Sequence, residues 1–146
     1  MQQAFESDIL QTIGNAPLVK LSRIIPENCA DIYVKLEYFN PTGSYKDRMA
    51  LAIGINGSHH VEGIGTGRIP PLLKRESYNE IRAIEESDAR KTAKSLAAEE
   101  GIFAGTSTGL NVFAAIQIGM ELGPGKTIVT VACDSGMKYL AGDLFD

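Results

Sequence analysis

An apolar run at residues 127–133, TIVTVAC, constrains the fold more than any other segment of the chain. Its β-branched residues and its lack of polar alternation are typical of a strand buried on both faces of a parallel sheet. Two helices with one apolar face precede it: the first is capped by Ser87 or Asp88 and stops at Gly101, and the second covers 110–122. Helices that alternate with such strands indicate an α/β domain whose sheet is mainly parallel and flanked by helices.

Shorter segments complete this predicted domain. A helix is expected to begin at about Ser44, and the glycine-rich stretch 54–67 is expected to be a loop. No linker or repeat divides residues 1–146, so we expect a single domain. Short strands are expected within 13–21, 31–37, 78–84 and 102–104, and a tight loop at 105–109.

Composition excludes several classes of partner. Lys and Arg number 14 against 18 Asp and Glu, and the net charge of -4 repels a nucleic-acid backbone. No apolar run approaches the roughly 18 residues of a membrane span. Cys29 and Cys133 lie far apart, which fits a reducing, cytoplasmic location, and the adjacent His59 and His60 do not form a metal-ligand pattern. We therefore expect no nucleic acid, membrane or metal partner.

Lys46 is the first residue that points to chemistry. Ser44 and Asp47 have the form of a capping box, so Lys46 is expected in the first turn of a helix. Unpaired backbone N–H groups place partial positive charge there, which favours the neutral amine that Schiff-base chemistry needs. The alternative is a solvated surface lysine beside Asp47 and Arg48, as most lysines are.

Four segments resemble one family in the same order along the chain. Residues 40–48, NPTGSYKDR, resemble the cofactor-lysine motif of the cysteine synthase and cystathionine β-synthase family, the fold-type-II pyridoxal phosphate enzymes. Residues 12–21, 61–67 and 133–140 resemble its N-terminal stretch, its active-site glycine loop and its C-terminal segment. The resemblance implies the large α/β domain of that fold and pyridoxal 5'-phosphate as cofactor.

The resemblance also implies roles for individual residues. Lys46 would bind the cofactor covalently and transfer protons, and Ser107 would hydrogen-bond the pyridine nitrogen. Gly63, Ile64 and Gly65 would line the substrate cavity. A hydroxyl, unlike a carboxylate, does not hold the ring nitrogen protonated, which favours elimination or replacement at Cβ over transamination.

The residues alone leave alternatives for two of these segments. The Ser/Thr-rich loop 105–109 around Ser107 is equally typical of a helix N-cap, or of an anion cradle at a helix start. Asp134 and Ser135 follow the 127–133 strand at its carboxyl end, where α/β sheets bind ligands, although a plain turn explains them equally well.

The resemblance breaks between Ile55 and Gly57. Full-length members are longer, and the missing part would contain the small domain, the loop for the substrate carboxylate and the loop for the cofactor phosphate. Loss of the phosphate loop weakens cofactor binding, because several backbone N–H groups normally meet that dianion. Strands left uncovered must repack or associate with another subunit.

Two functions follow from these observations. The family implies a pyridoxal phosphate-dependent β-replacement or β-elimination enzyme that acts on O-acetylserine or a related β-substituted amino acid. The alternative is an internally deleted, catalytically inactive relative that acts at most as a homo-oligomer or as a partner of a full-length homologue.

Overall fold

A computed structural model describes residues 8–47, 76 and 79–145 of the chain. Its sheet has three strands in the order β1-β2-β3, namely β1 (Leu18–Lys20), β2 (Asp31–Leu36) and β3 (Thr127–Ala132). β1 pairs antiparallel with β2 over three residues, and β2 pairs parallel with β3 over six. The α/β fold with a longer parallel pairing, expected from the sequence, is confirmed. Within the described ranges no helix is long and apolar enough to cross a membrane.

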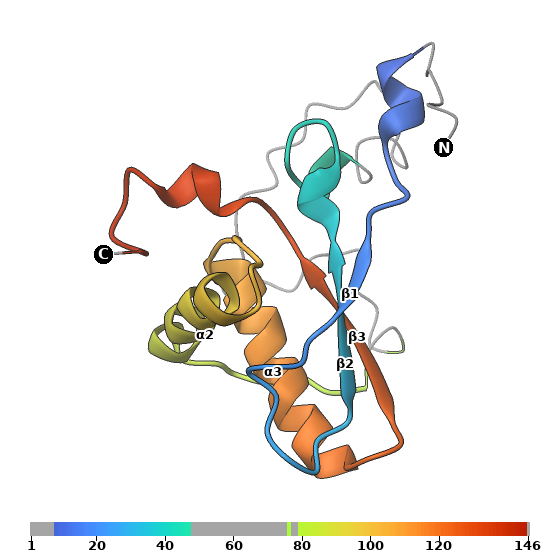
Figure 1. Ribbon diagram of the computed structural model, residues 1–146, viewed down its shortest axis with the longest axis vertical. Coiled ribbons are helices and arrows are strands. Elements are labelled where there is room, and N and C mark those ends of the chain that lie inside the picture. Colours follow the sequence, from blue (N-terminus) through green and yellow to red (C-terminus); the bar gives the residue numbers. More distant parts are fainter. Residues whose placement is uncertain (1–7, 48–75, 77–78, 146) are drawn as a thin grey trace.

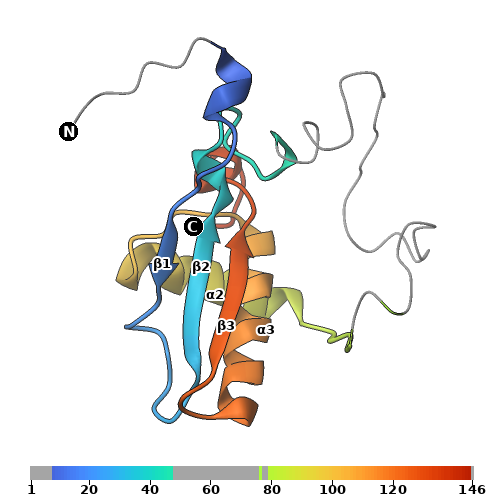
Figure 2. The same ribbon diagram turned by 90° about the vertical axis from the view of Figure 1, so that its right-hand side faces the viewer.

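Two helices cover one face of this sheet. α2 (Glu86–Glu99) and α3 (Thr106–Leu122) pack against each other, and α3 lies directly behind β2 and β3 (Figures 1 and 2). Short 3-10 turns complete the elements: η1 (Ile9–Thr12), η2 (Glu37–Phe39) and η4 (Gly136–Tyr139). This is a two-layer arrangement in which the second face of the sheet carries no described helix.

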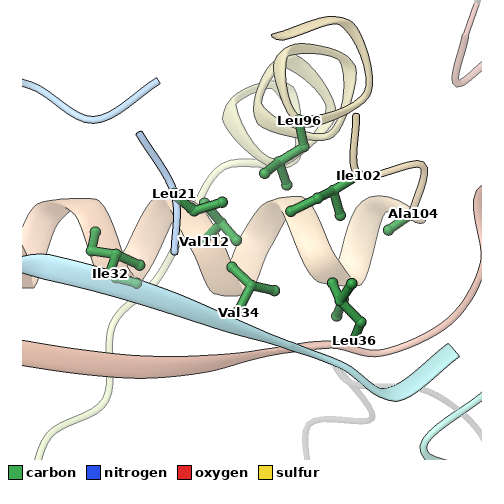
Figure 3. Packing of buried hydrophobic residues seen from close by; sticks show 10 residues of the cluster. Leu21, Ile32, Val34, Leu36, Leu96, Ile102, Ala104 and Val112 are labelled. Carbon is green, nitrogen blue, oxygen red and sulfur yellow. The ribbon is translucent and has the colours of Figure 1, made fainter. Parts of the chain in front are cut away.

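The core lies between β2 and the two helices (Figure 3). Alternate residues of β2 point to the helical side, because successive side chains of a strand face opposite ways. Their partners come from α2, α3 and the segments that flank them. The buried cluster includes Leu21, Ile32, Val34, Leu36, Leu96, Ile102, Ala104 and Val112.

Both helices begin earlier than the sequence analysis placed them. α2 starts at Glu86 with Glu85 as its N-cap, so Ser87 and Asp88 lie inside the first turn. The negative charge of Asp88 interacts favourably there with the helix dipole. α3 starts at Thr106, so the tight loop expected at 105–109 is wrong. The prediction failed because Gly109 was read as a turn residue, whereas it is a buried helix residue.

The strand predictions are only partly confirmed. β1, β2 and β3 lie where strands were expected, but residues 79–85 form no strand and 102–104 contribute only an isolated bridge between Ala104 and Ser135. β3 is not buried on both faces, since Val129 is 60% exposed. The physical reason is that the described helices cover one side of the sheet, so Thr127 and Val129 on the other side are exposed.

The remaining predictions concern the helix near Ser44 and the loop 54–67. Lys46 and Asp47 are helical, which agrees with a helix that begins at about Ser44. The predicted loop 54–67 and the proposed junction from Ile55 to Gly57 lie outside the described residues, as does the start of the predicted 78–84 strand.

Candidate functional site

Lys46 is the first helical residue after a compact loop. Its backbone N–H lies 3.3 Å from the Ser44 hydroxyl oxygen, which accepts the bond, so Ser44 caps this helix as expected, but the Asp47 carboxylate bonds Thr42 and does not complete the predicted capping box. The Ser44 side chain is buried, whereas Lys46 is exposed. The local sequence therefore fixes the backbone of Lys46 firmly and leaves its amine open to solvent.

The residue after the lysine closes the loop before it. The backbone N–H of Thr42 donates to Asp47 Oδ2 at 2.8 Å, and the Thr42 hydroxyl donates to Oδ1 of the same carboxylate. Asp47 is buried, with 8% of its surface exposed. A buried carboxylate is stable when such donors surround it. Asp47 is thus committed to loop structure and is not free to pair with the neighbouring lysine.

Hydrogen bonds of Asn40 join this loop to the N-terminal segment. The amide nitrogen of buried Asn40 donates to the Glu37 carbonyl at 2.7 Å and to Glu37 Oε2 at 2.8 Å. Its amide oxygen accepts the Gly14 N–H at 2.9 Å. One side chain therefore connects the 12–21 motif to the 40–48 motif.

Ser107 lies in the first turn of α3 and is half-buried. Gly105 is the N-cap, and its carbonyl accepts the N–H groups of Thr108 at 3.0 Å and Gly109 at 3.2 Å. Ser107 is therefore not the helix cap. Among the described residues its hydroxyl has no hydrogen-bond partner.

The segment 133–136, which follows β3, connects the two candidate residues. On one side it pairs with the loop before Lys46, and on the other with the residues before α3. Its hydrogen bonds are Tyr45 N–H to Cys133 O (2.9 Å), Ser135 N–H to Gly43 O (3.2 Å), Gly105 N–H to Asp134 O (3.4 Å) and Gly136 N–H to Phe103 O (3.0 Å). Lys46 and Ser107 consequently belong to two segments that flank the same chain segment at the carboxyl end of β3, where α/β sheets place ligands.

Side chains that the sequence analysis did not single out complete this region. The Thr108 hydroxyl accepts the Cys133 N–H at 3.0 Å, and Asn111 donates to Cys133 Sγ at 3.3 Å. Burial raises the pKa of the Cys133 thiol, the Asp134 charge adds to this, and Asn111 opposes it. The thiol therefore stays protonated and is unsuited to nucleophilic chemistry. No local pattern marks Thr108 or Asn111, because their partner lies more than twenty residues away.

Tyr139 also contributes to this region, within the segment 133–140. Its hydroxyl donates to Asp134 Oδ2 at 3.0 Å. Burial, together with the Asp134 charge, raises the pKa of Tyr139 to about 12, so the phenol remains a donor at ordinary pH. Ser135 has a local role: its hydroxyl accepts the Met137 N–H at 3.3 Å and caps η4.

The described residues fit the ring end of pyridoxal phosphate. Lys46 is an exposed lysine, and Ser107 supplies a hydroxyl in a helix first turn that has no hydrogen-bond partner among the described residues. Gly63, Ile64 and Gly65, expected to line a substrate cavity, lie outside the described residues. Of the residues expected in the site, the structure therefore describes Lys46 and Ser107.

Comparison with known families identifies the family of the chain. A family model described as pyridoxal-phosphate dependent enzyme matches residues 9–56 and 52–134. The chain therefore belongs to the family of pyridoxal-phosphate dependent enzymes, and the resemblance seen in the sequence is confirmed.

The curated proteins that match this chain in sequence include cysteine synthases. A probable cysteine synthase of Bacillus subtilis is 39% identical over 112 residues, which are 77% of this chain and 35% of that protein. A cysteine synthase of Staphylococcus aureus is 42% identical over 95 residues, which are 65% of this chain and 31% of that protein. The chain thus spans about a third of the length of the curated relatives it matches.

Solved structures share the fold. The crystal structure of cysteine synthase from Entamoeba histolytica aligns with a TM-score of 0.83 at 19% identity, covering 99% of this chain and 92% of that one. O-ureido-L-serine synthase aligns with a TM-score of 0.86 at 19% identity, covering 98% and 96%.

Proposed function

We propose that this chain retains the lysine and ring-nitrogen side of a cysteine synthase site but has no turnover of its own, and that it acts at most as a subunit or interaction partner. The observation that carries the proposal is the exposure of Lys46. When a lysine removes the Cα proton of a bound amino acid, the site must exclude water and surround the reacting group. An amine open to solvent fits cofactor attachment better than catalysis.

The comparisons support an internal deletion. The two matches to the family model meet and overlap at residues 52–56, close to the junction expected between Ile55 and Gly57. The sequence match covers about a third of a curated relative, whereas the structural alignment covers 92% of a solved chain. Both results are expected if this chain keeps the two ends of the family sequence and lacks its middle.

The retained residues have distinct tasks. Lys46 Nζ would hold pyridoxal phosphate covalently, and the Ser107 hydroxyl would face the ring nitrogen. When bound, the group supplies the electron sink that acidifies the Cα–H of an amino acid. Ser107 carries no charge, so it would leave the ring nitrogen unprotonated and favour chemistry at Cβ. Asp47 and Asn40 hold the lysine loop through the contacts described above.

One observation favours a second candidate, a β-replacement enzyme acting on O-acetylserine or a related β-substituted amino acid. Lys46 and Ser107 flank the same segment at the carboxyl end of β3, as the expected roles require. If another subunit covers this end of the sheet, the lysine becomes sheltered, and the site gains the water exclusion that the chain alone lacks.

A titration distinguishes the candidates. The purified chain is titrated with pyridoxal phosphate, reduced with borohydride and mapped by peptide mass, with Lys46→Ala as the site variant and Lys126→Ala as an exposed control. We expect saturable labelling confined to Lys46, and no acetate released from O-acetylserine and sulfide. Acetate release that is lost in Lys46→Ala supports the enzyme instead. Labelling spread over several lysines contradicts a retained cofactor site.

The proposed association is tested separately. The molar mass of the chain is measured by light scattering, alone and mixed with a full-length cysteine synthase. A homo-oligomer or a mixed complex is the expected result. A strictly monomeric chain in both samples argues against a subunit or partner role.

A further inference from the structure

We infer that Asp134 and Tyr139 are positioning residues that hold the first turn of α3, and hence Ser107, in place. This inference rests on the proposed function only in the statement that Ser107 faces the cofactor ring. The contacts of Asp134 and Tyr139 with the start of α3 are present in the chain without a ligand. Neither residue is expected to touch the cofactor. They act on the segment that carries the hydroxyl.

The Tyr139 ring lies against Gly105, the N-cap of α3. A Cβ at Gly105 would lie 2.2 Å from a ring carbon of Tyr139 and 2.9 Å from Asp134 Oδ1. Real Cβ atoms do not approach other atoms so closely, so any other residue at Gly105 would displace these two side chains. The N-cap of α3 is therefore held by direct packing and contributes no side-chain cap bond.

Asp134 contacts the same helix start through its backbone as well. Its carbonyl accepts the Gly105 N–H at 3.4 Å, and the neighbouring residues Ala104 and Ser135 form an isolated bridge. The carboxylate also lies near the positive end of the α3 dipole, which attracts a negative charge. Asp134 thus combines a backbone bond, a side-chain contact and an electrostatic attraction at one point.

The Tyr139 hydroxyl determines how the carboxylate is oriented. It donates to Asp134 Oδ2 at 3.0 Å, whereas the buried Oδ1 has no hydrogen-bond partner among the described residues. A buried carboxylate with one donor depends strongly on that donor. Loss of the phenol hydroxyl releases Asp134, and with it the packing on Gly105 two residues before Ser107.

Hydrogen exchange of the cofactor-free chain tests this directly. The N–H groups of Thr108 and Gly109 bond to the Gly105 carbonyl, so they report on the first turn of α3. Tyr139→Phe should speed their exchange about tenfold, the equivalent of one hydrogen bond to a charged group, and leave β2 unchanged. Tyr33→Phe, on the open face of the sheet, is the matched control. Equal acceleration throughout the chain, or none in α3, overturns the inference.

A steric rescue provides an independent test. Gly105→Ala should accelerate exchange in α3 because its new methyl group meets the Tyr139 ring. Adding Tyr139→Ala should restore part of the protection lost in Gly105→Ala, because it removes the clashing ring, but not the protection of the parent chain, because the bond that orients Asp134 is lost with it. A double variant as well protected as the parent chain would mean that Tyr139 does not hold this turn.

Pyridoxal phosphate affinity then links the turn to Ser107. The dissociation constant is measured for Ser107→Ala, Tyr139→Phe and the double variant. A positioning role predicts that Tyr139→Phe weakens binding severalfold in the parent chain and has no further effect once Ser107 is alanine. Additive effects contradict it. If the parent chain does not bind pyridoxal phosphate at all, the proposed function fails, while the exchange measurements still decide the positioning role.

Discussion

The backbone N–H of Thr42 lies 2.8 Å from Oδ2 of Asp47, so the residue that follows the candidate lysine anchors the loop that precedes it. The Thr42 hydroxyl donates to the other oxygen of the same carboxylate. The carboxylate nearest to Lys46 in the sequence, that of Asp47, therefore holds the loop through Thr42. The position of the Lys46 backbone therefore depends on the contacts of Asp47 with Thr42.

Asp47→Ala should lower the free energy of unfolding by about 2 kcal/mol, because a buried carboxylate that accepts two bonds is removed. Urea unfolding at pH 7 measures the loss. Asp8→Ala is the matched control: Asp8 is exposed and accepts a single N–H, from Leu10, so its removal should cost about 0.5 kcal/mol. Equal losses in the two variants would contradict the role given to Asp47.

Glu100 predicts a pH-dependent contribution to stability. Its Oε1 accepts the backbone N–H groups of Ser22, Arg23 and Ile24. Burial raises the pKa of Glu100, but these N–H bonds and the Arg23 charge outweigh it and leave the pKa below its ordinary value. A carboxyl group whose pKa is lower in the folded state stabilises the fold above its unfolded pKa of about 4.3, and this contribution disappears as the pH falls through the folded pKa.

Glu100→Gln should therefore destabilise the chain by about 1 kcal/mol at pH 7 and by progressively less below about pH 4. Unfolding is followed by circular dichroism at several pH values, beside Glu99→Gln, whose carboxylate lies next along α2 and is exposed. A difference between Glu100→Gln and the parent chain that stays constant from pH 7 to pH 3 excludes the carboxylate as its source.

The sequence predicts much of this fold because its strongest signals are local. The strands at β1, β2 and β3 follow from short apolar runs, and the end of α3 follows from Gly123, whose φ of 73° suits glycine. Ser44 was recognised as a cap because a cap acts over two residues. Each of these features depends on near neighbours, which a sequence pattern records.

Predictions failed where a distant segment decides the structure. Gly109 looks like a turn residue, yet it lies inside α3 because the backbone of α2 crosses there. β3 looks buried on both faces, yet it is half-exposed because no described element covers the second face. In the candidate site, the roles of Lys46 and Ser107 are expected from the family motifs, whereas the packing of Tyr139 on Gly105 joins two segments more than thirty residues apart and has no local pattern.

Gly109 provides a direct test of the crossing between the helices. A Cβ there would lie 1.9 Å from the Ala89 carbonyl oxygen and 2.9 Å from the Ala93 nitrogen, both backbone atoms of α2 that cannot rotate away. Gly109→Ala should lower the unfolding free energy by about 3 kcal/mol, even though alanine favours helix. Gly142→Ala, where the nearest atom is 3.6 Å away, is the control and should be nearly neutral. Thermal unfolding separates the two, and a neutral Gly109→Ala would mean that the helices are further apart.

The two faces of the sheet are distinguished by one substitution made at two positions. Val34 in β2 is fully buried against the helices, whereas Val129 in β3 is 60% exposed on the opposite face. Val34→Thr places a hydroxyl without a partner in the core and should cost about 2 kcal/mol of unfolding free energy. Val129→Thr should change it by less than about 0.5 kcal/mol, because water solvates the new hydroxyl and threonine suits strands. Chemical denaturation of both variants measures the contrast. A large loss from Val129→Thr in the monomeric chain would show that the second face is covered, and in an associated chain it would locate the contact on this face.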